Sequence, residues 1–97
     1  MKKIILFADD FGFSEGMNLG VIKACRKGAI TDINLIVNMM TSKEAVYLHD
    51  QYCPEIPMSA HINFVQGKPI SNPKEIPSLV DENGYFSGVP FLDVTQL

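Results

Sequence analysis

Two adjacent carboxylates, Asp9 and Asp10, follow a short apolar run near the start of the chain. Neighbouring negative charges repel one another, and on a low-dielectric rim they are costly unless a cation neutralises them. One aspartate can bind a metal ion while the other, pointing elsewhere, accepts a proton from an attacking water. The ordinary alternative is a turn and a helix cap at the end of a strand.

Three further polar residues, Asn38, His61 and Asn63, stand at the ends of later predicted strands. The carboxyl ends of parallel strands lie on one rim, so we expect these groups to converge with the aspartates. Carboxylate oxygen with imidazole nitrogen suits zinc, manganese, cobalt or iron better than calcium. Taken singly, His61 could be an ordinary histidine satisfied by one hydrogen bond, and both asparagines could close turns.

The first elements that must position these residues are a strand and a helix. The continuous apolar run Ile4–Ala8 predicts a strand buried on both faces. Ser14 can cap the helix that follows, whose apolar stripe is predicted at Met17, Leu19, Val21, Ile22 and Cys25. Gly28 can adopt the left-handed conformation that ends it.

A second strand and helix follow, and then a third strand. The β-branched run 32–38 predicts the strand, and Thr41 with Glu44 predicts a capping box for a helix reaching about Tyr52. The segment 58–63 predicts a shorter third strand. We expect His49, on the second helix, to face solvent.

The order strand, helix, strand, helix, strand predicts an α/β fold with a parallel βαβαβ unit. After Asn63 this alternation stops, and prolines punctuate an extended segment. Within it, Asp81–Gly84 predicts a short hairpin, because Asn-Gly favours the tight turn. We predict one α/β domain over residues 1–97.

The composition of the chain limits which binding partners and which cellular compartment we expect. A net charge of −3 on 97 residues argues against nucleic acid or an anionic membrane as partner. The apolar run after Lys3 is shorter than an export signal or a membrane span, which predicts a cytoplasmic protein. Cys25 and Cys53 are expected to be reduced thiols that pack as small hydrophobes.

Three stretches resemble the YdjC-like carbohydrate deacetylases, the chitooligosaccharide deacetylase family: FADDFGFSEGMNLGVIKACRKGAITDINLIVNM, SAHINFVQGKP and IPSLVDENGYF. The resemblance implies the first part of a (β/α) barrel of the glycoside hydrolase/deacetylase type. It also implies removal of acetyl groups from N-acetylated oligosaccharides. A divalent metal held by one aspartate and two histidines would assist the hydrolysis.

Carried across by position, Asp10 would be the metal-ligand aspartate, Asp9 the catalytic base and His61 the first metal-ligand histidine. We expect Asn38 and Asn63 to contact the sugar. The expected ion is Mg²⁺ or Zn²⁺, with Mn²⁺ or Co²⁺ as alternatives.

The chain also departs from the family pattern. Family members are more than twice as long, and no histidine follows His61 to serve as the second histidine ligand. We therefore expect an amino-terminal portion of such an enzyme. Three strands cannot close a barrel, so the chain is expected to form a homo-oligomer or to associate with the missing part. Two alternatives stay open: a non-catalytic sugar-binding module, and a receiver-like signalling domain with an acidic pair after its first strand.

Overall fold

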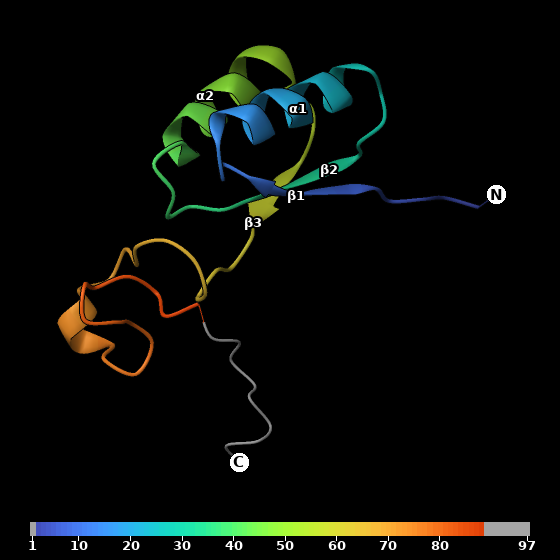
Figure 1. The fold of residues 1–97 in the computed structure, drawn as a ribbon. Helices are drawn as coiled ribbons and strands as arrows, with labels where there is room; N and C mark the ends of the chain where they lie inside the picture. The colour runs from blue at the N-terminus through green and yellow to red at the C-terminus, as the bar shows by residue number, and fades with distance from the viewer. Residues whose placement is uncertain (1, 89–97) are drawn as a thin grey trace. The chain divides into compact units, whose positions relative to one another are not determined.

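The computed structural model describes residues 2–88, which belong to two compact units that divide between Ile62 and Asn63. The first unit contains the alternating elements that the sequence predicts. These are β1 (Phe7–Phe11), α1 (Glu15–Arg26), β2 (Asp32–Leu35), α2 (Ser42–Tyr52) and β3 (Met58–Ala60). The strands form a parallel sheet in the order β1-β2-β3, and both helices cover one face of it (Figure 1). The predicted βαβαβ unit is therefore confirmed.

The core of this unit lies between the sheet and the two helices. Its buried members are Phe11, Val21, Ile22, Cys25, Ile33, Ala45 and Cys53. Ile33 is fully buried, while its neighbour Asn34 is only partly buried. Because successive strand residues point to opposite faces, Asn34 lies on the face away from the helices.

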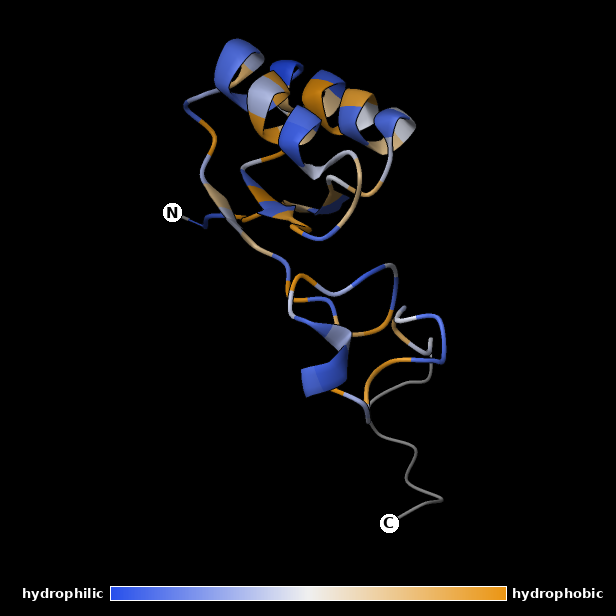
Figure 2. Ribbon diagram, turned by 90° about the vertical axis from the view of Figure 1, so that its left-hand side faces the viewer, coloured by the Kyte–Doolittle hydropathy of each residue, from blue (hydrophilic) through white to orange (hydrophobic). Residues whose placement is uncertain are grey.

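The amino-terminal run is not the strand that its composition predicts. The strand begins at Phe7, and the side chains of Ile4, Ile5 and Leu6 are 76, 65 and 51% exposed. In Figure 2 the chain is hydrophilic at its very start and hydrophobic in the stretch that follows. Among the described residues both helices cover the same face of the sheet, so the burial of β1 on both faces that the sequence predicts does not occur here.

Helix α1 has the predicted boundaries, but its buried face is partly different. Ser14 caps it by accepting a hydrogen bond from the Met17 amide at 3.1 Å, and Gly28 has the expected positive φ of 76°. Met17 and Leu19 are 39 and 53% exposed, whereas Asn18 is fully buried. A polar residue thus occupies a core position that the apolar stripe did not predict.

Two predictions about α2 are wrong. Thr41 makes no capping hydrogen bond through its side chain, because its hydroxyl donates to the Gly12 carbonyl at 2.7 Å. His49 is 7% exposed rather than solvent-facing. Its Nε2 lies 2.7 Å from the Ile56 carbonyl and its Nδ1 lies 3.2 Å from an Asp50 oxygen, so both ring nitrogens have partners that make burial tolerable.

The two cysteines are free thiols buried in the core, as predicted. Burial, followed by the neighbouring Cys53 thiol, raises the pKa of Cys25 from 9.0 to about 11. Burial is also the main reason that the pKa of Cys53 is raised. Both groups therefore remain protonated at neutral pH.

Over its described residues, 63–88, the second unit has little regular structure. This part contains a 3₁₀ turn at Pro73–Glu75 and an antiparallel bridge between Val80 and Phe86. The Asp81 amide donates to the Tyr85 carbonyl at 2.7 Å, and Gly84 has a φ of 82°. The predicted short hairpin is thus confirmed, while residues 89–97 of the predicted domain lie outside the described residues.

Within residues 2–88, no helix combines the length and the apolar character that crossing a bilayer requires.

Candidate active site

The two adjacent carboxylates lie in a β-bulge near the end of β1. Ala8 pairs with Ile33 and Phe11 pairs with Leu35, so β1 spans this interval with one residue more than β2 does. Asp10 has a φ of +63° at this bulge, a conformation that aspartate tolerates better than most residues. A bulge re-aims side chains, and here Asp9 and Asp10 contact different partners.

Asp10 lies beside His61. The Asp10 Oδ1 is 3.4 Å from the His61 Nδ1, and the Asp10 amide donates to the same nitrogen at 3.3 Å. His61 follows the last residue of β3, where its own amide donates to the Leu35 carbonyl at 2.8 Å. The carboxyl ends of β1 and β3 therefore bring these two predicted site residues together.

Asp9 instead contacts the middle strand. The Asn34 side-chain amide donates to Asp9 Oδ1 at 2.8 Å across the β1–β2 pair. The sequence patterns described above do not single out Asn34. Its position between two core residues, Ile33 and Leu35, is the signal that could have placed it on the same face as Asp9.

A buried hydrogen-bond network fixes the turn that follows the acidic pair. Asn18 Oδ1 accepts from the Gly12 amide at 2.6 Å, and its Nδ2 donates to the Thr41 carbonyl at 3.0 Å. The Thr41 hydroxyl closes the ring by donating to the Gly12 carbonyl. The turns after β1 and β2 are therefore joined through α1, which holds the rim that carries Asp9 and Asp10.

The two asparagines that the sequence predicts to bind sugar do not lie directly at the ends of β2 and β3. Asn38 lies three residues beyond β2, partly buried in the connection to α2. Asn63 belongs to the second unit, where its Oδ1 accepts from the amides of Val65 and Gln66. Asn63 therefore closes a turn of its own rather than ending β3.

The donor pair fits part of a divalent-ion site. Two ligands at ordinary zinc distances on a tetrahedral ion are about 3.4 Å apart, close to the observed separation of Asp10 Oδ1 and His61 Nδ1. The single lone pair of Nδ1 accepts the Asp10 amide hydrogen bond at 3.3 Å, so binding of an ion through Nδ1 requires this bond to open. The side chains of Asp10 and His61 are 47 and 33% exposed, so an ion can reach them from solvent. No cluster of three or more His, Cys, Asp or Glu side chains occurs among the described residues. The fit is thus two ligands of a set that ordinarily needs at least three.

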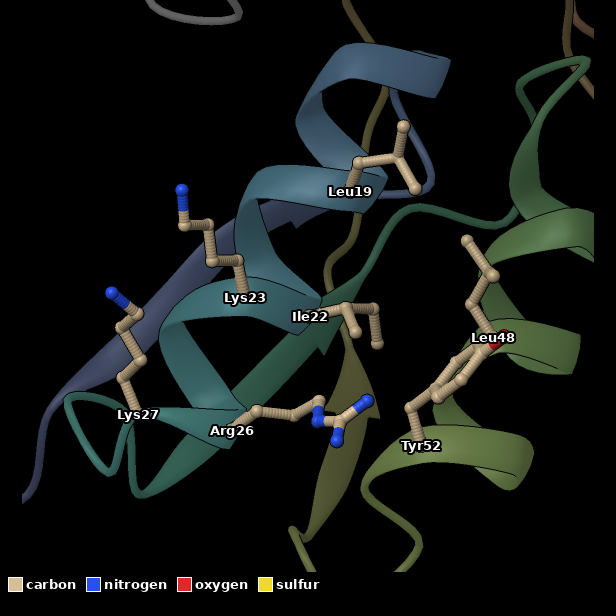
Figure 3. A pocket seen from close by; sticks show the side chains of 7 residues that line it. All are labelled: Leu19, Ile22, Lys23, Arg26, Lys27, Leu48 and Tyr52. Atoms are coloured by element: carbon tan, nitrogen blue, oxygen red, sulfur yellow. The ribbon is translucent and has the colours of Figure 1, made fainter.

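A groove of about 570 Å³ lies elsewhere in the first unit, between α1 and α2 (Figure 3). Its lining consists of Leu19, Ile22, Lys23, Arg26, Lys27, Leu48 and Tyr52. The Arg26 guanidinium carbon lies 5.6 Å from the centre of the Tyr52 ring. This groove is distinct from the rim that carries Asp9, Asp10 and His61, and its lining includes no carboxylate or histidine.

Residues 3–96 match the family model described as YdjC-like protein. This chain belongs to the YdjC-like family. This membership argues against the receiver-like alternative that the acidic pair alone had left open.

Several relatives of this YdjC-like chain are named for their activity. A carbohydrate deacetylase of Thermoanaerobacter pseudethanolicus is 38% identical over 86 residues, which are 89% of this chain and 34% of that protein. A chitooligosaccharide deacetylase of Serratia marcescens is 40% identical over 83 residues, covering 86% of this chain and 31% of that protein. The chain therefore spans about a third of the length of the relatives it matches.

A solved structure shares the fold of this YdjC-like chain. It is from Enterococcus faecalis V583 and is described, provisionally, as a cellobiose-phosphate cleavage protein. The two are 33% identical with a TM-score of 0.82, over 88% of this chain and 33% of the other. The similarity again covers about a third of the longer protein.

Proposed function

We propose that this chain supplies the catalytic base and two metal ligands of a metal-dependent deacetylase acting on N-acetylated oligosaccharides. The observation that carries the proposal is the 3.4 Å separation of Asp10 Oδ1 and His61 Nδ1 at the carboxyl ends of β1 and β3. The family relationship and the names of the relatives support the deacetylase chemistry. In the same proposal, the βαβαβ unit is the first part of a (β/α) barrel.

Asp10 and His61 would hold the ion, with a further ligand from elsewhere. Mg²⁺ and Zn²⁺ are the proposed ions, with Mn²⁺ or Co²⁺ as alternatives. When bound, a divalent ion supplies Lewis acidity toward the acetamide carbonyl.

Asp9 has the chemistry of the general base. Its carboxylate accepts a proton from the water whose oxygen attacks the acetamide carbon. The carbon–nitrogen bond then breaks, and acetate and a free sugar amine leave once the amine nitrogen has received a proton. The bulge that turns Asp9 away from Asp10 allows one carboxylate to bind the ion while the other remains available for this proton.

The test is release of acetate from N,N′-diacetylchitobiose by the purified 97-residue chain, supplied separately with Mg²⁺ and Zn²⁺. We expect metal-dependent release that Asp9→Asn abolishes, because the amide cannot accept the proton. Asp50→Asn is the control, because Asp50 contacts His49 on α2 rather than the acidic pair. Absence of release with both ions, or full activity in Asp9→Asn, would contradict the proposal.

A non-catalytic sugar-binding module is the second candidate, favoured because the described residues provide only two clustered donors. Calorimetry with chitobiose in the presence and absence of chelator separates the two functions. Metal-independent binding without hydrolysis would support the module. Metal-dependent hydrolysis would support the enzyme.

Self-association is the proposed means of covering exposed apolar surface. Ile4, Ile5, Leu6 and Phe7 are each at least half exposed, and consecutive exposed apolar residues of this kind are unusual on a monomer. We propose a homo-oligomer, or association with a further segment of the fold, that buries them.

A further inference from the structure

We infer that Asn34 is a positioning residue that fixes the orientation of the proposed base, Asp9; the inference rests on the function proposed above. The contact that carries it is the 2.8 Å hydrogen bond from Asn34 Nδ2 to Asp9 Oδ1. The two residues are 25 positions apart in sequence, so only the pairing of β1 with β2 brings them together.

The sheet register constrains this contact. Ala8 pairs with Ile33 on the helix-covered face, so the next residue of each strand, Asp9 and Asn34, lies on the opposite face. On the other side of β2, Asn34 pairs with the exposed Ser59 of β3. Asn34 therefore belongs to the central strand of the sheet, whose backbone is held by a neighbour on each side.

An asparagine has the properties that positioning a base requires. Its amide donates a hydrogen bond but remains neutral across the working pH range, so it does not compete for the proton that the base must accept. Bonding to Oδ1 leaves Oδ2 as the oxygen to which the proton can go. The bond also limits rotation of the carboxylate, which favours a productive approach of water.

NMR spectroscopy of the 97-residue chain tests the contact directly. The Asn34 side-chain amide protons are compared in ¹H–¹⁵N spectra of the wild type and of Asp9→Asn at one pH. We expect one of these protons to shift in Asp9→Asn, because it loses its carboxylate acceptor. Asp32→Asn is the matched control and should leave the Asn34 signals in place, because Asp32 is a β2 carboxylate that accepts from the Thr31 hydroxyl instead. Asn34 amide signals that are the same in the wild type and in Asp9→Asn overturn the inference.

Kinetics test the consequence in the acetate-release assay. We expect Asn34→Ala to lower kcat by roughly tenfold or more while KM changes little, because orientation and not sugar binding is lost. Ser59→Ala, on the same face, should leave kcat unchanged, and backbone spectra of each variant confirm that it is folded.

Different results refute the proposed role of Asp9 as base and the proposed role of Asn34. Full activity in Asp9→Asn refutes the proposed base. An inactive Asp9→Asn together with an Asn34→Ala variant of wild-type kcat refutes only the role of Asn34. Absence of turnover in the isolated chain counts against the proposed function, whereas the NMR comparison tests separately whether Asn34 holds Asp9.

Discussion

At the residue scale, the acidic pair depends on a backbone conformation that few side chains adopt without strain. Asp10 has a φ of +63°, and left-handed backbone costs an L-residue on the order of 1 kcal/mol. The same turn contains Gly12, whose φ is +98°. The positive φ of Asp10 helps to give Asp9 and Asp10 different partners, and the positive φ of Gly12 lies in the turn toward α1.

Replacing Gly12 with alanine should strongly destabilise the fold. A methyl group there would lie 2.6 Å from the Ile36 carbonyl oxygen and 3.3 Å from the Ser42 Cα, and backbone cannot easily move aside. Gly28→Ala is the matched control, because Gly28 also has a positive φ but no atom within 4 Å of its added methyl. We expect Gly28→Ala to cost about 1 kcal/mol and Gly12→Ala at least about 2 kcal/mol more, measured by urea denaturation. Equal losses would show that the contact with Ile36 is unimportant.

At the element scale, α1 does more than cover the sheet. Its buried Asn18 joins the turn after β1 to the turn before α2, and these turns bound the rim that carries Asp9 and Asp10. Buried polar groups are costly unless they are paired, and here the amide group of the side chain uses both its acceptor and its donor.

Asn18→Ala should lower the free energy of unfolding by about 2–3 kcal/mol, because it leaves the buried Gly12 amide without its acceptor. Ser14→Ala, at the start of the same helix, removes a partly exposed cap and should cost about 1 kcal/mol. Urea denaturation followed by circular dichroism measures both. A smaller loss for Asn18→Ala than for Ser14→Ala would contradict the proposed role of the network.

The Cys25 thiol predicts a loss of stability at high pH. Its pKa is raised in the folded chain from 9.0 to about 11, so the folded state holds this proton more tightly than the unfolded state. The stabilisation that this difference provides is present below pH 9.0 and is lost as the pH rises toward about 11. We expect the stability gap between wild type and Cys25→Ala to narrow over this interval in urea titrations. A gap that stays constant from pH 8 upward would contradict the assignment.

At the scale of the whole molecule, sequence patterns predict the order of elements better than their edges. The alternation of apolar runs with capped helical segments gives the βαβαβ unit, because each pattern is local. The start of β1 is set instead by hydrogen bonds with β2, which explains why Ile4–Leu6 precede the strand despite their composition. The burial of His49 is not predicted for a similar reason, since the Ile56 carbonyl that lies within hydrogen-bond distance of its ring comes after the end of α2.

For the candidate site, too, the sequence predicts which strand ends come together but not the details that depend on strand register. Strand-end reasoning places Asp10 and His61 together, because parallel strands share a rim. It does not predict the bulge at Asp9 and Asp10, which depends on the register between strands. The Asn34 contact depends on that register as well, and Asn63 lies beyond the short β3 in a turn that its own side chain closes.

The most direct test of the central claim is paramagnetic broadening by Mn²⁺ in NMR spectra of the 97-residue chain, since it detects even weak ion binding. We predict that substoichiometric Mn²⁺ broadens the signals of Asp10 and His61 first, and that Asp10→Asn and His61→Ala each remove this effect while Asp50→Asn does not. Broadening centred elsewhere, such as on Asp81 and Glu82, or broadening at Asp10 that survives loss of the His61 ring, would contradict a shared ion.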